Sequence, residues 1–328
     1  MTTAQAIRYH EHGKPQDVLR FENIEIADPG ADEVQIRLLA ATINPSDFGM
    51  IGGSYGRLAA LPATAGREGV GEVVAVGEGG DKALVGRRVR FPDDGAWQTL
   101  ANARAGDLWF IPEDIPLELA AMSFVNPPTA WRLLRDAYLQ KGDWVIQNAG
   151  NSAVGIFVIQ MARHLGLNTI SVVRRPEASE ALGEFGAKHV FIDNDEYLNK
   201  IDEITDGKRP QLALNMVGGE SAIRLIKSLA NGGKMVTFGG AATEPVRFPT
   251  RYFIFNDVML KGFWMDHWYR TNTRERINIM LSKIYALMRE GTIKAPVEAK
   301  FPLSQFKEAL EKAARPRCGK ILLVPDPE

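Results

Sequence analysis

Cysteine is almost missing from this chain of 328 residues, which contains a single one, Cys318. A lone cysteine cannot form an intramolecular disulfide, and it also excludes a cysteine-rich zinc site. Charge of one sign is not in excess either, because the formal net charge is −1 at pH 7. This balance gives no electrostatic reason to expect a nucleic acid or an anionic membrane as partner.

Long apolar runs are missing as well, since no stretch approaches the ~18 consecutive residues that would span a bilayer. The first residues, MTTAQAIRYHEHG, have neither the apolar core of a secretory signal nor the Arg- and Ser-rich, acid-poor composition of a transit segment. Hydrophobic residues make up 45% and charged residues 24% of the chain, which is typical of a soluble globular enzyme. We therefore expect a cytosolic protein.

The chain changes character near residue 116. Before this point it contains short strands separated by turns, for example VQIRLLAATI, GVGEVVAVG and RRVRF. After it, strands and helices alternate, as in WVIQNA followed by SAVGIFVIQMARHLG, which is typical of a parallel sheet with right-handed crossovers. The tail GKILLV is strand-like again. The predicted class is α/β, with a β-rich domain of residues 1–116, rejoined by about 295–328, and a parallel-sheet domain of residues 117–294.

The stretch WVIQNAGNSAVG has the outline of a dinucleotide-binding turn, with an apolar strand, a tight corner and an amphipathic helix. The fingerprint G-x-G-x-x-G runs from Gly150 to Gly155, but Ser152 occupies the position of the middle glycine. The hydrolase elbow G-x-S-x-G does not fit, because Val154 stands where its second glycine is required. Two alternatives remain: a chance succession of strand, turn and helix, or a turn that binds phosphate with a serine.

Helix chemistry favours the phosphate-binding alternative. Asn151 and Ser152 are good helix caps, and the free N–H groups and positive dipole end of a helix attract phosphate. Gly150 can form the turn, and Gly155 can allow close packing of helix on strand. We therefore interpret this segment as a phosphate cradle formed by Gly150, Asn151, Ser152, Ala153, Val154 and Gly155.

Two arginines indicate which dinucleotide to expect. In a site for NAD, an acidic residue ~20 positions downstream binds the ribose hydroxyl. In this chain Arg174 and Arg175 stand there, at the end of ISVV, and guanidinium groups suit the 2′-phosphate of NADPH. The alternative is a solvated arginine pair at a strand end. We favour NADPH as the cofactor.

Several motifs together resemble one known family. The stretches NPSDFGMIGGSYG, REGVGEVVAVG, NPPTAWRLL, GDWVIQNAGNSAVG, VVRRP and LKGFW are spread over nearly the whole chain. They resemble the medium-chain dehydrogenases/reductases, most closely the enoyl thioester reductases of the mitochondrial trans-2-enoyl-CoA reductase type. Quinone oxidoreductases form the next branch and usually carry glycine in place of Ser152. The resemblance implies a GroES-like β domain formed by both chain ends and a six-stranded Rossmann domain between them.

The same resemblance bears on metal ions. Zinc-containing relatives carry a cysteine at the position of Asn44, a histidine at that of Arg67, and a structural lobe with four cysteines. This chain has none of these ligands. We therefore expect no bound metal, and hydride transfer without the help of a Lewis acid.

The resemblance also implies further site residues. Tyr55, in GGSYG, matches the family's catalytic tyrosine, which is thought to donate a proton or to orient the substrate; the alternative is an aromatic residue in a surface turn. For the aromatic residues of the cofactor site, a place in the core is the alternative. The remaining residues expected to contact the cofactor are Asn126, Thr129, Phe238, Gly239, Gly240, Ala241, Phe263, Trp264, Met265 and Lys320.

The leading functional hypothesis is NADPH-dependent reduction of the 2,3 double bond of a 2-enoyl thioester, carried by CoA or by acyl carrier protein. The nearest alternative is a quinone or enone reductase of the same fold, for which Tyr55 would be dispensable. A third is a non-catalytic NADPH-binding protein of the crystallin kind. The segment RYFIFNDVMLKGFW is expected to pair edge to edge with a second copy in a homodimer.

Overall fold

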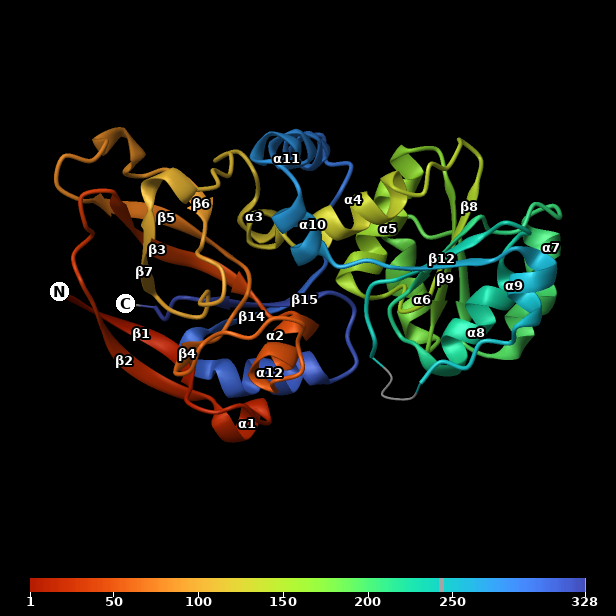
Figure 1. Cartoon of the computed structure of the whole chain (residues 1–328), viewed down its shortest axis with the longest axis horizontal. Helices are drawn as coiled ribbons and strands as arrows, with labels where there is room; N and C mark the ends of the chain where they lie inside the picture. The colour runs from red at the N-terminus through yellow and green to blue at the C-terminus, as the bar shows by residue number, and fades with distance from the viewer. Residues whose placement is uncertain (242–244, 328) are drawn as a thin grey trace. The chain divides into compact units, whose positions relative to one another are not determined.

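The computed structural model describes residues 1–241 and 245–327, and the chain divides into two compact units (Figure 1). Unit 1 comprises Met1–Val125 and Ala295–Glu328, and unit 2 comprises Asn126–Lys294. The first boundary lies later in the chain than the expected 116/117. The reason is helix α3 (Leu117–Met122), which packs against strands of unit 1 and so belongs to the β-rich unit.

Unit 1 contains a small and a large sheet. In the small one, β1 (Thr2–Tyr9) lies between β2 (Arg20–Ile26) and β4 (Ala63–Thr64) and is antiparallel to both. The large sheet has the order β14-β15-β3-β5-β6, with β7 also paired to β3. Its strands are β3 (Glu33–Thr42), β5 (Gly69–Val76), β6 (Arg88–Arg90), β7 (Leu100–Arg104), β14 (Val297–Pro302) and β15 (Lys320–Val324). Helices α1 (Pro15–Val18), α2 (Pro45–Ile51), α3 and α12 (Phe306–Ala314) complete the unit, with 3₁₀ turns at Lys82–Leu84, Ala105–Asp107 and Leu303–Gln305.

Alternating side chains explain how the large sheet forms its core. In β3, Ile36 and Leu38 are buried whereas Arg37 between them is exposed, as expected for a strand with one face on a core. Strand β15 is buried along nearly its whole length because it lies between β14 and β3, with Leu322 opposite Thr42. The strand-like tail is therefore an interior strand of unit 1.

Unit 2 is a parallel sheet whose strands alternate with helices along the chain. The strand order is β10-β9-β8-β11-β12-β13, so the direction of winding reverses between β8 and β11. In open sheets of this kind, ligands bind outside the carboxyl ends of the strands at that switch point. The strands are β8 (Trp144–Gln147), β9 (Asn168–Val173), β10 (His189–Ile192), β11 (Leu212–Asn215), β12 (Lys234–Thr237) and β13 (Met259–Gly262). The helices are α4 (Asn126–Arg135), α5 (Ala153–His164), α6 (Glu177–Gly183), α7 (Ile201–Ile204), α8 (Gly219–Ser228), α9 (Arg251–Asn256), α10 (Met265–Thr271) and α11 (Arg274–Arg289), with a 3₁₀ segment at Asp195–Lys200.

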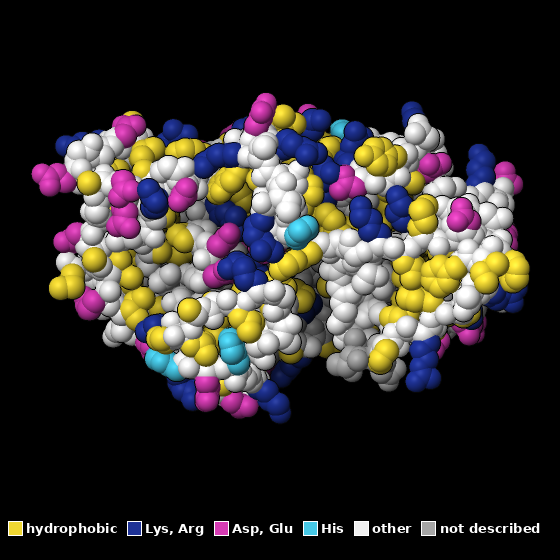
Figure 2. Space-filling view, in the orientation of Figure 1, with side chains coloured by type: hydrophobic (Ala, Val, Ile, Leu, Met, Phe, Trp, Pro, Cys, Tyr) yellow, Lys and Arg dark blue, Asp and Glu magenta, His cyan; other side chains and the backbone are white. Residues whose placement is uncertain are grey.

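The predicted α/β class, with a β-rich and a parallel-sheet part, is confirmed. The inner strands β8 and β11 are buried on both faces, whereas every residue of the edge strand β13 is exposed. Cationic and anionic side chains are interspersed on the face shown in Figure 2. Among the helices of the described residues, none is both long and apolar enough to cross a membrane.

Candidate active site

The turn after β8 brings the chain so close to its neighbours that two glycines are required. The N–H of Gly150 donates to the carbonyl of Val172 on β9 at 3.2 Å, and a Cβ at Gly150 would lie 2.7 Å from the Cβ of Ser171. A Cβ at Gly155 would lie only 2.5 Å from the carbonyl oxygen of Gly150. Both values are shorter than real contacts, so the turn and the first turn of α5 leave bare backbone at these positions.

Helix α5 begins at this turn with a serine cap. Ser152 is the N-cap residue, and its Oγ accepts a hydrogen bond from the N–H of Gly155 at 3.1 Å. The hydroxyl proton is still available to donate elsewhere. The first turn of the helix carries no acidic residue, so a negative charge meets the positive end of the helix without repulsion. Asn151 is half-buried just before the cap, and Ala153 and Val154 open the helix.

Arg174 and Arg175 directly follow β9, the strand adjacent to β8. Arg174 is exposed and Arg175 is half-buried. Parallel strands end at the same edge of a sheet, so both cations lie at the edge that carries the turn of Gly150. Taken together, the bare backbone, the serine hydroxyl and the two guanidiniums fit the phosphates of NADPH.

The other predicted cofactor residues of unit 2 are spread over three places. Phe238 to Ala241 follow β12, with the N–H of Phe238 donating to the Asn215 carbonyl at 3.0 Å. Phe263, Trp264 and Met265 follow β13, and the N–H of Phe263 donates to the Thr237 carbonyl at 2.9 Å. These two segments therefore lie at the carboxyl edge of the sheet. Asn126 and Thr129 are both buried and lie three residues apart on helix α4, which places them on one side of that helix.

A ladder of buried amides joins the strands at this same edge, and sequence reasoning missed it. Asn148 Nδ2 donates to Asn215 Oδ1 at 2.9 Å, and Asn148 Oδ1 accepts from the N–H of Met216 at 2.7 Å. Asn215 Nδ2 in turn donates to Thr237 Oγ1 at 3.1 Å. The ladder links the ends of β8, β11 and β12 and so fixes the starts of the loops that follow them.

A second pair of side chains, Gln147 and Ser171, extends the ladder to β9. Gln147 Nε2 donates to Ser171 Oγ at 3.1 Å and to the carbonyl of Gly155 at 3.0 Å. The same amide therefore ties the helix that carries the serine cap to both neighbouring strands. The signal in the sequence was the pair QN at the end of a strand that is otherwise apolar.

In unit 1, Tyr55 lies in the loop after α2. The N–H groups of Ser54 and Tyr55 both donate to the carbonyl of Gly49, at 2.9 and 3.1 Å, and the Tyr55 side chain is half-buried. The guanidinium carbon of Arg67 lies 4.5 Å from the centre of the Tyr55 ring. This distance is within the range of a cation–π contact.

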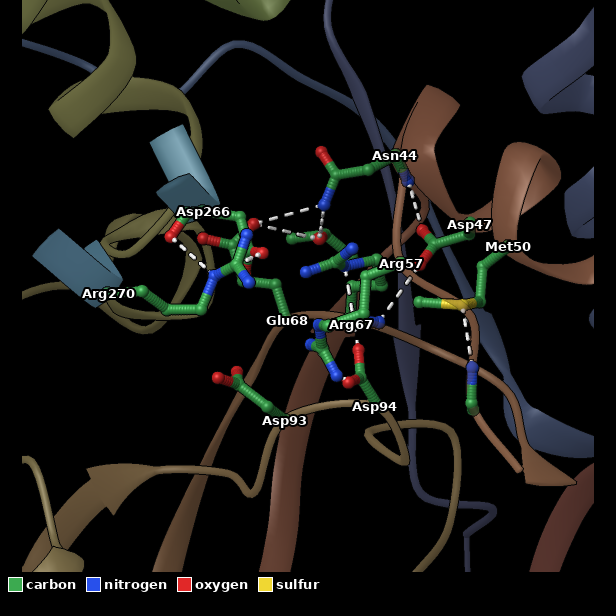
Figure 3. Close-up of polar contacts among 12 residues, drawn as sticks. Asn44, Asp47, Met50, Arg57, Arg67, Glu68, Asp93, Asp94, Asp266 and Arg270 are labelled. Carbon is green, nitrogen blue, oxygen red and sulfur yellow. Dashed lines mark hydrogen bonds and ion pairs between the residues drawn. The ribbon is translucent and has the colours of Figure 1, made fainter. Parts of the chain in front are cut away.

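A cluster of buried charges surrounds Asn44, the residue before α2 (Figure 3). Glu68 Oε2 accepts from Thr42 Oγ1 and from Asn44 Nδ2, both at 3.1 Å. Its Oε1 accepts from the N–H groups of Phe124 at 3.0 Å and Val125 at 2.7 Å, the last residues before the chain enters unit 2. Glu68 therefore connects the end of β3 with the segment that leaves the unit.

Asp47 and Lys320 belong to the same buried cluster. Asp47 accepts from the N–H of Asn44 at 2.5 Å and from that of Arg67 at 2.9 Å. Lys320, expected to contact the cofactor, is only 3% exposed; its Nζ donates to the Ile43 carbonyl at 3.0 Å and to Asn44 Oδ1. The structure thus places this ammonium among the buried groups of unit 1.

Burial shifts the pKa values of these groups in opposite directions. It raises the pKa of Asp47 to about 7, although Lys320 and Arg67 counteract this. It likewise raises the pKa of Glu68. Burial of the Lys320 ammonium lowers its pKa to about 8, while Glu68 acts in the other direction. The cause is the same in each case, because removal from water disfavours the charged form.

The positions that carry zinc ligands in related enzymes have other partners in this chain. The Asn44 side chain is bonded to Glu68 and Lys320, and Arg67 is a cation that cannot ligate a metal. In residues 1–241 and 245–327, no group of three or more His, Cys, Asp or Glu side chains could hold a metal ion.

Comparisons with known proteins cover nearly the whole chain. Residues 30–106 match the model of the alcohol dehydrogenase GroES-like domain, and residues 153–282 match that of the zinc-binding dehydrogenases. The chain is 42% identical over 321 residues to the mitochondrial enoyl-[acyl-carrier-protein] reductase of Homo sapiens, which covers 95% of this chain and 86% of that protein.

Two solved structures show the same fold over 99% of this chain and all of theirs. The complex of Etr1p with NADP and crotonyl-CoA has a TM-score of 0.89 at 30% identity. A protein from Bacillus thuringiensis provisionally named an NADPH:quinone reductase has a TM-score of 0.90 at 28% identity. The predicted GroES-like and Rossmann parts are thereby confirmed.

One expectation is wrong. Relatives from Homo sapiens, Xenopus tropicalis and Arabidopsis thaliana are all named mitochondrial, which contradicts a cytosolic location. The expectation rested on the first residues of the chain. Most of them, Thr2–Tyr9, form strand β1, so their composition reflects their place in the sheet.

Proposed function

Because the chain belongs to the medium-chain dehydrogenases/reductases, in the branch of the enoyl thioester reductases, we propose that it reduces the 2,3 double bond of 2-enoyl thioesters with NADPH. The observation that carries this proposal is the similarity to the human enoyl-[acyl-carrier-protein] reductase over 95% of the chain. The protein is an oxidoreductase whose substrate is an acyl thioester of CoA or of acyl carrier protein.

The carboxyl edge of the unit 2 sheet is the proposed place of the cofactor. NADPH, when bound, supplies the hydride for the β-carbon of the enoyl group. Gly150 and Gly155 leave backbone open to its phosphates, Ser152 offers a hydroxyl, and Arg174 and Arg175 offer two cations to the 2′-phosphate. Residues 238–241 and 263–265 follow neighbouring strands and line the same edge, and Asn126 and Thr129 are proposed to contact the nicotinamide.

Tyr55 is proposed to act on the thioester. Once the β-carbon has gained a hydride, negative charge is shared between the α-carbon and the thioester oxygen. A phenol can donate a proton to the α-carbon, or it can donate a hydrogen bond to the oxygen and orient the substrate. Asn44 and Arg67, which stand at the positions of zinc ligands in related enzymes, are bonded within the buried cluster. The negative charge is therefore proposed to be stabilised by hydrogen-bond donors of the protein.

A quinone or enone reductase is the second candidate function. It is favoured by the structural similarity to the provisionally named quinone reductase from Bacillus thuringiensis. In a quinone reductase Tyr55 would be dispensable, because the reduced quinone is protonated on oxygen and no carbon has to be protonated. This difference allows the two functions to be separated.

The test compares NADPH oxidation with crotonyl-CoA, a longer enoyl-CoA and a small quinone. We expect both enoyl thioesters to be reduced, and Tyr55→Phe to lower kcat with them by about 10²-fold or more, the usual contribution of a positioned proton donor. Turnover of the quinone alone, at equal rates in both proteins, would show that the enoyl reductase assignment is wrong.

The cofactor preference has its own test. Replacing both Arg174 and Arg175 by Ala should raise the KM for NADPH by about 10- to 100-fold and leave the KM for NADH nearly unchanged. The charge-assisted bonds that are removed contact only the 2′-phosphate, which NADH lacks. Equal activity of the unmodified enzyme with NADH and NADPH would rule out this role.

We also propose a homodimer formed through the edge strand β13. Met259 and Leu260 on this strand are 48% and 39% exposed, and an open strand edge offers unpaired backbone groups to a second copy. A related structure is the Etr1p/Etr2p heterodimer from Candida tropicalis. Light scattering should give the mass of two chains, and Leu260→Lys should give that of one; a monomeric wild type would exclude the dimer.

A further inference from the structure

Arg67 packs against the face of the Tyr55 ring. The distance from the guanidinium carbon to the ring centre is 4.5 Å, and Arg67 is only 7% exposed. A cation–π contact is stronger where water is excluded, and the flat guanidinium favours a stacked geometry. The contact therefore restrains both the position and the tilt of the ring.

Arg67 is held in place by groups on two other segments. Its main-chain N–H donates to Asp47 Oδ1 at 2.9 Å, and its side-chain Nε lies 3.7 Å from Asp94 Oδ1. Asp94 also forms an ion pair with Arg57, which stands two residues after Tyr55 in the same loop (Figure 3). The Asp94 carboxylate thus joins Arg67 to the loop that carries the tyrosine.

The backbone of the loop fixes only the base of Tyr55. The two hydrogen bonds to the Gly49 carbonyl hold the main chain of residues 54 and 55. They do not select the side-chain rotamer, which depends on what the ring packs against. On one face of the ring this packing partner is Arg67.

We propose that Arg67, anchored by Asp94, is a positioning residue for Tyr55. Its guanidinium holds the phenol in the rotamer that presents the hydroxyl to the enoyl thioester. This inference rests on the proposed enoyl reductase function and adds to it the group that orients the tyrosine. It concerns unit 1 alone, so binding of NADPH by unit 2 is expected to be independent of Arg67.

A double-mutant cycle tests the proposal. Arg67→Met keeps the length of the stem and removes the cation, and it is made in the wild type and in Tyr55→Phe. With crotonyl-CoA, we expect Arg67→Met to lower kcat about 5- to 20-fold in the wild-type background, with the KM for NADPH unchanged within about twofold. In Tyr55→Phe we expect no further fall, because the hydroxyl to be positioned is already missing. Arg67→Lys keeps the charge and should recover part of the loss.

Arg87→Met is the matched control, because Arg87 makes the same kind of contact in the same unit, 4.9 Å from the ring centre of Phe110. This variant should leave kcat unchanged. Urea unfolding midpoints show whether each variant is folded. Equal falls in kcat in the two backgrounds would overturn the positioning role while the enoyl reductase function stands. An Arg67→Met enzyme with wild-type kcat would overturn it as well. A wild type that does not reduce crotonyl-CoA would instead remove the proposed function itself.

Discussion

The two units hold their functional loops with different kinds of buried polar group. Unit 1 uses ionisable side chains, with Asp47, Glu68 and Lys320 all buried around Asn44. Unit 2 uses neutral amides, with Asn148 and Asn215 bonded to each other across two strands. Charges give strong bonds whose strength changes with protonation, whereas amides keep the same bonds at every ordinary pH. We therefore expect the bonds of the buried cluster in unit 1 to change in strength with pH, and those of the amide ladder in unit 2 to stay the same.

Each arrangement depends on complete bonding. Glu68 accepts four hydrogen bonds, and the Asn148 side chain bonds to Asn215, Met216 and Ser221. A buried polar group that loses a partner costs free energy, so such networks select a single arrangement. The loss of one member is therefore the most direct way to compare them.

The largest effect is expected from removing the buried ammonium. Lys320→Met removes a buried cation that favours the charged forms of Glu68 and Asp47, and it should lower the free energy of unfolding at pH 7 by about 3–5 kcal/mol. Lys300→Met is the control, since Lys300 pairs with Glu118 at a half-exposed site of the same unit and should cost less than about 1 kcal/mol. Urea unfolding measures both. Equal losses of unfolding free energy in Lys320→Met and Lys300→Met would mean that burial does not strengthen the contribution of the cluster.

In unit 2 the sharpest change is at a glycine. Gly155→Ala adds a Cβ that would lie 2.5 Å from the Gly150 carbonyl, so the turn must open. We expect the Kd for NADPH, from fluorescence titration, to rise about 100-fold through the loss of the phosphate cradle. Gly183→Ala is the matched control, because nothing lies within 4 Å of a Cβ there. An unchanged Kd in Gly155→Ala would exclude this turn as the phosphate site.

A smaller effect is expected from the amide ladder. Asn148→Ala leaves Asn215 Oδ1 and the Met216 N–H without this partner and should cost about 2 kcal/mol of unfolding free energy. Because no member of the ladder titrates, the cost should be the same in urea at pH 6 and at pH 8. A cost that differs between the two pH values would break the contrast between the units.

The last prediction concerns the pH dependence of stability in unit 1. The pKa of Asp47 is raised to about 7 in the folded protein, against about 3.9 in an unfolded chain. Its contribution to stability is therefore complete below about pH 4 and is lost as pH rises through 7, by up to about 1.4 kcal/mol per pH unit. Asp47→Asn should be less stable overall but show a flatter decline between pH 5 and pH 7 in urea unfolding. An equal decline in both proteins would show that Asp47 is not the group responsible.

Local patterns in the sequence predicted the parts of the site that depend on neighbouring residues. The turn from Gly150 to Gly155 and the cap of Ser152 follow from short-range rules for helix starts, and the structure has both. The position of Arg174 and Arg175 follows from the strand that precedes them. The roles of these residues toward the cofactor remain predictions.

The networks could not be predicted because their members are distant in the sequence. Asn148 and Asn215 meet only when β8 and β11 pair, and an asparagine after a strand is equally typical of a turn. Lys320 was matched to a cofactor contact, but its neighbours Ile43 and Asn44 are set by the pairing of β15 with β3. Glu68 gave one signal that was overlooked, a carboxylate immediately before an apolar strand.

The position of strand β15 in the chain determines when unit 1 can be completed during synthesis. It is an interior strand of unit 1, between β14 and β3, although all of unit 2 is translated before it. At ~5–20 residues per second, β3 therefore leaves the ribosome roughly 15 to 60 s before the strand that will cover its edge. Unit 2 is continuous in the chain and can fold during that interval. The nascent chain thus exposes an unpaired strand edge until residues 320–324 emerge and close the unit that was begun first.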